Sequence, residues 1–509
     1  MISREDTWHG RYGVTPGYGI SLQDGFEDTF TASATAALEM GSFPYAKGVI
    51  DNWLSFYVRD NGMTTYRAEE LAQAGRMLTI FAMYVEMTGD DALLLKHWKK
   101  AKALATWLKY RWELSLTQFP STDPRHGIPP GGDEGDGFIA IFAGFPGSHD
   151  GNANQLSHKY SCAGGIYRGF RDIGLMWTQL GARAKRPDIV AHGKDLLTIA
   201  PKLRAAIQTS IAKTTKKVIV HGKPFTCIPN GADPKKVLSP PTDPNAVCTD
   251  GGGRSYPELF YSGVLTKEQA NDIYETLTTS NGSYVTRPIT LGCAGYNNKQ
   301  VTFWSYGLAY GLLQHDMVER FLLHYFAMSA HTYTRGSQTT PEAVHPDRDV
   351  ASTDYVAAGV VTASTYLKWM LVYEEPDNRT VWLGKAIPRD WLHYETAQPI
   401  VVKNATTRYG RVSYTLTPKS HEPGMSVHAS VTLPSTYAAG ASSAPAGGLK
   451  LRIRVPLPFA GKLKSVTVGG VPWPHIDPKE ETIVFTPQSL TQATMSGLAN
   501  IVATFGVAS

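Results

Sequence analysis

The chain has 509 residues, of which 42% are hydrophobic and 18% are charged, so it can fold into one large domain and a small one and is not of the disordered class. Its formal net charge is only +5 and no run of Lys and Arg stands out, which argues against a nucleic-acid partner. No stretch of about 18 apolar residues is present, so we expect no membrane span and no membrane partner.

From residue 27 to residue 375 the sequence follows the period of α-helices. We expect helices over residues 27–40, 45–58, 68–87, 92–114, 158–180, 186–213, 266–279, 305–330 and 352–374. Short connections alternate with long loops rich in Gly, Pro, Asp and Tyr, at 116–157, 214–265, 280–302 and 331–351. This alternation predicts helical hairpins that close into a ring, and long loops gathered at one end of the ring would form the active-site face.

After about residue 380 the pattern changes to the period of two that is typical of half-buried strands. It is clearest over residues 412–417, 425–433 and 449–455, with turn residues between these segments. Strands at such short spacing predict an antiparallel β-sandwich. We therefore expect a mainly α protein of two domains, a helical domain over residues 1–378 and a β-sandwich domain over residues 379–509.

The segment Trp-Leu-Gly-Lys-Ala-Ile-Pro-Arg-Asp-Trp-Leu at 382–392 resembles the junction between the last helix and the C-terminal sandwich of many (α/α)6-toroid (six-hairpin) glycosidases. The helix pattern over 73–90 is also similar to these proteins. The layout is similar to the alpha-L-rhamnosidase family, although that family's Arg-Asp-Glu-Arg run before Gly-Trp is absent here. The resemblance covers most of residues 20–509 and implies an (α/α)6 helical toroid, a C-terminal β-sandwich and an enzyme that acts on glycans.

An acidic loop within residues 126–138 is the densest group of candidate catalytic residues. Asp133, Glu134 and Asp136 lie within four positions and are bracketed by Gly. Crowded carboxylates raise the pKa of one of them, which a general acid at neutral pH requires. We interpret Glu134 and Asp136 as catalytic and Asp133 as substrate-binding; a solvated acidic turn or a Ca²⁺-binding loop is the alternative.

A second candidate segment covers residues 331–345 and contains Glu342, Tyr333 and Arg335. Glu342 follows Pro341 in a polar loop and is the candidate general base that activates water, although a surface Glu is the alternative. Tyr333 and Arg335 are candidate substrate-binding residues, since the planar fork of Arg suits sugar hydroxyls or a uronate. An acid and a base on separate loops suit inverting hydrolysis, which needs two carboxyl groups about 6.5–9.5 Å apart.

Five further residues are candidate substrate contacts. They are Arg67, Glu69, His158, Tyr160 and Trp304. Each lies near the expected start of a helix or among aromatic residues, and aromatic rings stack on sugar faces. For each of them a structural role, in helix capping, a surface ion pair or the core, is the alternative.

Three functions fit these residues. The first is an inverting glycoside hydrolase that uses these carboxylates as acid and base and acts on a plant or microbial oligo- or polysaccharide. The second is a polysaccharide lyase that abstracts a proton beside a uronate with a Tyr or His base. The third is a glycan-binding protein without activity, since a fold alone does not establish a reaction. The sequence predicts no organic cofactor and no catalytic metal, allows a structural Ca²⁺, and is compatible with a monomer or a homodimer.

The cysteines and the N-glycosylation pattern give information on the cellular compartment of the protein. Cys162, Cys227, Cys248 and Cys293 form no Cys-x-x-Cys motif, and a disulfide between Cys227 and Cys248 is as compatible with the sequence as buried thiols. Three matches to the N-glycosylation pattern occur, and the first residues contain no apolar signal region. We expect a secreted or periplasmic protein rather than a cytoplasmic one.

Overall fold

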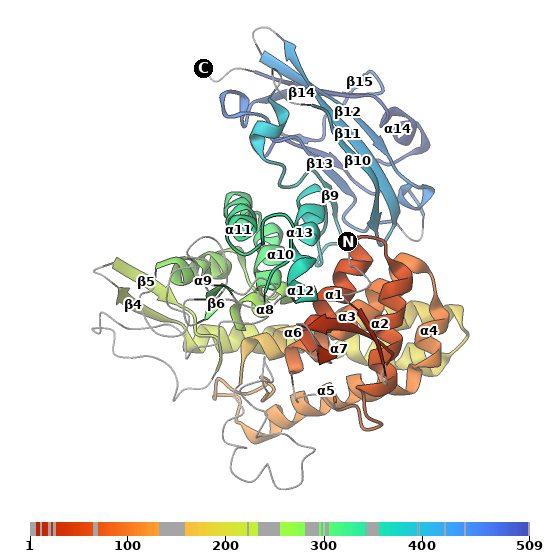
Figure 1. The fold of residues 1–509 in the computed structure, drawn as a ribbon, viewed down its shortest axis with the longest axis vertical. Helices are drawn as coiled ribbons and strands as arrows, with labels where there is room; N and C mark the ends of the chain where they lie inside the picture. Colours follow the sequence, from red (N-terminus) through yellow and green to blue (C-terminus); the bar gives the residue numbers. More distant parts are fainter. Residues whose placement is uncertain are drawn as a thin grey trace. The chain divides into compact units, whose positions relative to one another are not determined.

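A computed structural model gives the fold over most of the chain (Figure 1). It describes residues 7–10, 13–18, 22–23, 27–64, 70–131, 158–220, 223–232, 255–279, 295–296, 299–300, 305–341, 344, 356–393, 395, 398–421, 424–441 and 444–506. The chain divides into two compact units. The helical unit comprises Met1–Ala37, Ser42–His315 and Leu323–Ala363, and the sheet unit comprises Leu38–Gly41, Asp316–Leu322 and Ser364–Ser509. The division into domains at residue 378 stays a prediction.

The first part of the chain is mainly helical, as predicted. Its helices are α1 (Glu27–Glu39), α2 (Phe43–Phe56), α3 (Leu71–Thr88), α4 (Asp91–Lys96), α5 (Trp98–Gln118), α6 (Tyr160–Arg183), α7 (Pro187–Thr214), α8 (Ser255–Ser262), α9 (Lys267–Thr279), α10 (Tyr306–Gln314), α11 (Val318–His331), α12 (Ala357–Val360) and α13 (Thr362–Leu371). Short strands accompany them: β1 (Thr7–Gly10), β2 (Gly13–Tyr18), β3 (Leu22–Gln23), β4 (Lys216–Val220), β5 (Lys223–Cys227), β6 (Gly295–Tyr296) and β7 (Lys299–Gln300).

Several expected helices differ from the observed ones. The helix expected over 92–114 is two helices that meet at His97, and the helix expected over 305–330 is divided between α10 and α11. At the second break Asp316 has a φ of 58°, in the left-handed region that an α-helix cannot continue through. The loop expected over 214–265 contains the β4–β5 hairpin and α8, which is too short for its periodicity to stand out.

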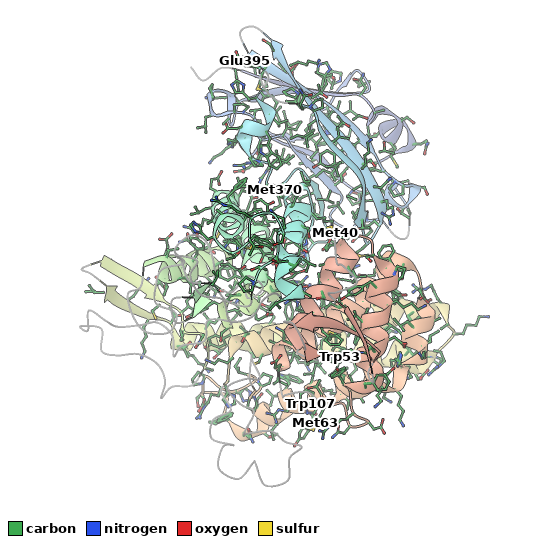
Figure 2. The ribbon with its side chains drawn as sticks, viewed as in Figure 1. Met40, Trp53, Met63, Trp107, Met370 and Glu395 are labelled. Carbon is green, nitrogen blue, oxygen red and sulfur yellow. The ribbon has the colours of Figure 1, made fainter. Side chains whose placement is uncertain are left out.

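The helices alternate between two kinds of environment. Nearly every residue of α3, α6, α8 and α10 is buried, whereas the helices between them each have an exposed face. A stripe of apolar residues on one side suits an outer helix, and a helix buried all round suits an inner one. In the packing of α2 on α3, Trp53 (labelled in Figure 2) is fully buried. Its ring centroid lies 6.1 Å from that of Phe81.

Glycines set the close approach of the inner helices. A Cβ at Gly165 of α6 would lie 2.6 Å from the carbonyl oxygen of Ala72 in α3, and one at Gly169 would lie 2.4 Å from that of Gly75. The residue numbers of the paired positions increase together along both helices, so α3 and α6 run parallel. A Cβ added to α10 at Gly307 would likewise meet Pro257 of α8, and one at Gly311 would meet Phe260, so α8 and α10 also run parallel.

The C-terminal part of the chain forms two sheets. One has the strand order β10 (Ile400–Thr407), β11 (Gly410–His421), β12 (Gly424–Thr432), β18 (Ile501–Phe505), β14 (Leu463–Val468) and β15 (Val471–Pro472). The other has the order β16 (Ile476–Asp477), β17 (Thr482–Phe485), β13 (Leu449–Arg452), β9 (Val381–Leu383) and β8 (Val372–Glu374). All pairs are antiparallel except β9 with β13, which are parallel. A six-residue helix, α14 (Gln492–Gly497), precedes the last strand.

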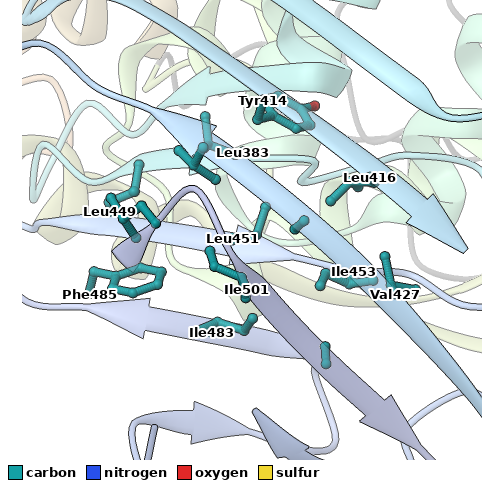
Figure 3. Packing of buried hydrophobic residues seen from close by; sticks show 14 of the residues in the cluster. Leu383, Tyr414, Leu416, Val427, Leu449, Leu451, Ile453, Ile483, Phe485 and Ile501 are labelled. Carbon is teal, nitrogen blue, oxygen red and sulfur yellow. The ribbon is translucent and has the colours of Figure 1, made fainter. Parts of the chain in front are cut away.

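One buried apolar cluster serves both sheets (Figure 3). Leu416 and Val427 come from the six-stranded sheet, and Leu451, Ile483 and Phe485 come from the five-stranded one. Residues of alternating strand positions supply this cluster, which explains the period of two in the sequence. Over the described ranges of the chain, no helix is long and apolar enough to cross a membrane.

Candidate functional site

Four segments outside the described residues lead directly into inner helices. Residues 65–69 precede Glu70 and α3, residues 132–157 precede α6, residues 233–254 precede α8, and residues 301–304 precede α10. Six predicted site residues lie in the first, second and fourth of them: Arg67, Glu69, Asp133, Glu134, Asp136 and Trp304. Glu342 also lies outside the described residues, in a segment that precedes α12. The roles of these residues stay predictions, and the described part shows where their segments are attached.

The attachment points of the acidic loop lie beside those of its neighbours. His158 and Gly231 belong to paired backbone segments, because the amide of Ala232 donates to the carbonyl of His158 at 2.8 Å and that of Tyr160 donates to Asn230 at 3.0 Å. At the other end of the loop, a Cβ at Gly131 would lie 2.4 Å from Cδ1 of Leu71. The segment with the predicted acid therefore starts beside α3 and ends beside the segment that leads to α8.

A buried polar cluster joins these four helices. It consists of Gln73 and Arg76 from α3, Arg168 from α6, Glu258 and Tyr261 from α8, and Tyr306 and Tyr310 from α10, and we call it the Arg–Tyr–Glu cluster. Gln73 Nε2 donates to Glu258 Oε1 at 2.9 Å, and Thr31 of α1 donates to Gln73 Oε1 at 2.7 Å. Contacts between residues near the starts of α3, α8 and α10 place these three starts at the same end of the helical unit.

Arg76 lies at the centre of the cluster. Its Cζ lies 4.2 Å from the ring centroid of Tyr306 and 4.6 Å from that of Tyr261, so aromatic faces cover the guanidinium. Its Nη1 donates to Glu258 Oε1 at 3.4 Å, whereas its Nε and Nη2 are buried and bond to no residue that the structure describes. Burial would lower the pKa of Arg76, but the carboxylate of Glu258 and the two tyrosines outweigh it and raise that pKa.

Arg168 forms the second cationic part of the cluster. Its guanidinium donates to the carbonyl oxygen of Tyr261 and, at 3.3 Å, to the hydroxyl of Tyr310, and its Cζ lies 3.8 Å from the Tyr261 ring centroid. Asp172, one helical turn further along α6, lies 3.6 Å from its Nε. Arg168 thereby connects three inner helices through contacts that are all buried.

Glu258 supplies the carboxylate of the cluster, and the sequence analysis did not predict it as a site residue. Its Oε1 accepts from both Gln73 and Arg76, while its Oε2 accepts from no residue in the described part of the chain. The side chain is 7% exposed, and Oε2 is not among its enclosed atoms. It falls inside the expected loop 214–265; the only sequence signal was one acidic residue within the aromatic run Tyr256–Tyr261.

His158 and Tyr160, predicted as substrate contacts, are both buried and engaged with protein groups. His158 Nδ1 lies 2.6 Å from the carbonyl oxygen of Ile128. The hydroxyl of Tyr160 lies 3.0 Å from Ser210 and 2.7 Å from Thr214 of α7, and burial raises its pKa to about 12. These surroundings favour the structural alternative for both residues, although their substrate-binding role stays a prediction.

Tyr333 and Arg335, the other predicted contacts, lie just after α11. The hydroxyl of Tyr333 donates to the carbonyl of Gly359 at 2.6 Å and accepts from the amide of Ala363 at 3.0 Å, so it fastens this turn to α12. Arg335 is exposed. The described residues bring neither of them into the Arg–Tyr–Glu cluster.

The described part of the chain contains one disulfide-bonded cysteine and one free cysteine. Cys227, at the end of β5, is disulfide-bonded, and its partner lies outside the described residues. Cys162 is buried in α6. Among the side chains that the structure describes, no three His, Cys, Asp or Glu residues gather where they could hold a metal ion. A structural Ca²⁺ on the acidic loop stays a prediction, since that loop lies outside this part.

No protein-family model and no curated protein matches the chain. Among solved structures it is similar to a protein titled "Glycosidase Wild Type", with 14% identity, 72% of this chain and 93% of the other covered, and a TM-score of 0.43. It is also similar to the alpha-L-rhamnosidase from Dictyoglumus thermophilum (11% identity, 97% and 46% covered, TM-score 0.42) and to a sialidase (9%, 87% and 37%, 0.43). These titles agree with the resemblance to glycosidases found in the sequence, but likenesses this weak assign no reaction or substrate to this chain.

Proposed function

We propose that the protein is a glycoside hydrolase that acts by inversion, with Glu134 or Asp136 as the general acid and Glu342 as the general base. One observation carries the proposal: first turns of buried inner helices meet in a polar cluster, and the segment with the predicted acid is attached beside them. Active sites are usually built from loops at one end of a rigid scaffold.

The attachment of the segment with Glu342 supports its part in the proposal. The amide of Val356 donates to the carbonyl of Thr340 at 3.0 Å, so the two ends of this segment lie together. Thr340 and Val356 are both buried, and α12 follows at once. The segment that contains Glu342 is therefore attached beside the start of α12.

In the proposed reaction, one carboxylic acid donates its proton to the glycosidic oxygen as the bond to the anomeric carbon breaks. Glu342 removes a proton from a water molecule that attacks the opposite face of that carbon, which inverts its configuration. The substrate is an oligo- or polysaccharide. No organic cofactor takes part.

The architecture proposed with this function is an (α/α)6 toroid followed by a β-sandwich. The alternation of fully buried and half-exposed helices supports a ring, as do the parallel neighbours α3 with α6 and α8 with α10. Contacts of β2 with both α2 and α12 bring the first and last elements of the helical unit together. The apolar cluster common to both sheets supports the sandwich.

Secretion is proposed with the function. A disulfide such as that of Cys227 persists in oxidising compartments and is rare in the cytosol. An enzyme that attacks polysaccharides meets its substrate outside the cell.

The test is a screen of plant, algal and bacterial glycans followed in parallel by released reducing ends and by ultraviolet absorbance. Once a substrate is found, proton NMR of the first product gives the anomeric configuration. Glu342→Gln and Glu134→Gln or Asp136→Asn should each lower kcat by about 10²–10⁴-fold. The matched control is Glu113→Gln, because Glu113 is half-exposed on α5. Retention of configuration, or near-normal kcat in all three variants, would overturn the proposal.

The same screen decides between hydrolysis and the two alternatives. Elimination would produce an unsaturated uronate and ultraviolet absorbance, but Tyr160, one tyrosine that could serve as the base, has a raised pKa and bonds to two hydroxyl groups. His158 is held by a backbone carbonyl. A protein that only binds glycans would release neither reducing ends nor an absorbing product.

A further inference from the structure

The two oxygens of the Glu258 carboxylate have unequal surroundings. Gln73 and Arg76 both donate to Oε1, which fixes the plane and position of the group. Oε2 has no donor among the described residues and is not enclosed. A carboxylate held on one side and open on the other can accept a hydrogen bond from a ligand without having to be reoriented first.

The fixed side of the carboxylate belongs to a chain of hydrogen bonds that crosses three helices. Thr31 in α1 donates to Gln73 in α3, and Gln73 donates to Glu258 in α8. All three side chains are buried. Because each is held by the next, Glu258 is placed by the scaffold rather than by a loop.

The guanidinium groups of Arg76 and Arg168, in contrast, are not accessible to a ligand. The side chains of Arg76 and Arg168 are only 3% and 2% exposed. The rings of Tyr261, Tyr306 and Tyr310 cover their guanidinium faces. Among the described side chains of the cluster, Oε2 of Glu258 is therefore the charged atom that is not enclosed, and its charge is negative.

The Arg76 guanidinium beside Glu258 is also incompletely hydrogen-bonded within the described part of the chain. Nε and Nη2 of Arg76 are buried and carry N–H groups that no described residue accepts. Buried polar groups in native proteins nearly always have a partner, which is protein, ordered water or ligand. These groups lie on the guanidinium that holds Glu258, and because they are enclosed, an ordered water rather than the sugar itself is the partner that can satisfy them.

We propose that Glu258 binds a hydroxyl group of a neutral sugar and thereby selects neutral sugars over uronic acids at the site; this inference rests on the proposed function. A sugar O–H donates to the ionised Oε2 in a charge-assisted hydrogen bond, which is shorter and stronger than a neutral one. A uronate in the same place puts a second carboxylate beside the first. The two carboxylates repel each other. Arg76 and Arg168 are enclosed and do not contact the ligand, so they do not offset this repulsion by direct hydrogen bonds.

The experiment uses the full chain and matched pairs of free sugars that differ only at C6. The pairs are glucose with glucuronic acid, galactose with galacturonic acid and mannose with mannuronic acid, and titration calorimetry at pH 7 measures Kd. At least one neutral sugar should bind the wild-type protein about tenfold or more tightly than its acid partner. A wild-type protein that binds the acids as well as the neutral sugars, or binds neither, overturns the inference.

Glu258→Gln tests the residue itself, with Glu113→Gln as the matched control. The substitution should weaken neutral-sugar binding about 10- to 100-fold and reduce the discrimination against uronates. Circular dichroism and the unfolding midpoint establish that the variant folds. A folded variant with unchanged affinity and unchanged discrimination overturns the inference; if the variant does not fold, the wild-type comparison of the sugar pairs decides.

The two proposals fail in different ways. Hydrolysis that depends on Glu342 and proceeds equally well on uronate-rich glycans leaves the proposed function standing and overturns the role of Glu258. Selective binding of neutral sugars without release of reducing ends overturns the hydrolase and leaves the role of Glu258 standing.

Discussion

Two buried arginines, one in each unit, have opposite surroundings. In the sheet unit, Arg452 is 4% exposed and every nitrogen of its guanidinium has a partner: two bonds to Asp316 at 2.6 and 2.8 Å, one to Glu480 at 3.1 Å and one to Thr482 at 3.2 Å. In the helical unit, Arg76 is 3% exposed and, among the described residues, has a single hydrogen bond of 3.4 Å, to Glu258.

The difference separates a structural ion pair from a candidate site. A fully paired buried arginine keeps most of its interaction energy within the protein, and removing one partner of such a pair is costly. An arginine with unsatisfied N–H groups contributes less to stability and leaves polar capacity for water or a ligand. Four changes test how far this comparison holds, in order of decreasing expected effect on stability.

Arg452→Met should have the largest effect, because it leaves Asp316 beside the buried Lys385 without its main partner. We expect a loss of about 3 kcal/mol in the free energy of unfolding, measured by urea denaturation of the full chain. The control is Arg183→Met, which breaks a half-exposed pair with Asp91 and should cost less than about 1 kcal/mol. Equal losses in the two variants would break the comparison.

Gly169→Ala tests the close packing that brings α3 and α6 together. The added Cβ would lie 2.4 Å from the carbonyl oxygen of Gly75, so the two backbones must move apart. Such overpacking should lower the free energy of unfolding by about 2 kcal/mol, seen as a lower midpoint in thermal denaturation. Gly497→Ala is the control, since its nearest contact is a Val468 methyl group at 3.2 Å that can move. A Gly169→Ala midpoint equal to the control's would contradict the packing described for α3 and α6.

Arg76→Met should cost about 1 kcal/mol, which is less than Arg452→Met. It removes one long hydrogen bond, and it also removes two buried nitrogens, Nε and Nη2, whose N–H groups no described residue accepts, which offsets part of the loss. Gln73 still holds Glu258. The two methionine variants are compared in the same urea experiment; a loss as large as that of Arg452→Met would mean that Arg76 is a structural residue of the same kind.

Lys385 gives the pH dependence of the sheet unit. Burial lowers its pKa from 10.5 to about 8 in the folded protein, so between pH 8 and pH 10.5 the unfolded chain binds more protons at this residue. The contribution of Lys385 to stability therefore rises with pH in this window, by at most about 1 kcal/mol per pH unit. Lys385→Met should lack this term, so the stability of the wild type relative to the variant should increase between pH 8 and pH 10. Parallel pH profiles would contradict the lowered pKa.

Much of the fold follows from local patterns. The expected starts and ends of α1, α2, α6, α7 and α9 lie within three residues of the observed ones, and the expected strands are present. The breaks at His97 and Asp316 were not predicted, because apolar periodicity continues through both of them. Asp316 has a left-handed backbone and bonds to Arg452, which is 136 positions away, so no local pattern marks this break.

The candidate site could be predicted only in part. Its acidic loops stand out by composition, and their carboxylates stay predicted catalytic residues. The Arg–Tyr–Glu cluster has no such signal, because its members are single polar residues within apolar or aromatic runs. A lone Glu at position 258 has no visible partner in the sequence, and its hydrogen bond to Gln73 spans 185 positions.

The sequence by itself determined the helical and sheet parts, the approximate ends of most helices and the classes of function that composition excludes. These depend on the repeat of apolar residues over a few turns or a few alternations, which is a local property of the chain. Only the tertiary structure decided which of the many Arg, Glu and Tyr residues meet, and which atoms among them lack a partner. Those contacts arise where parallel helices pack through glycine, and the packing joins residues that no local pattern relates.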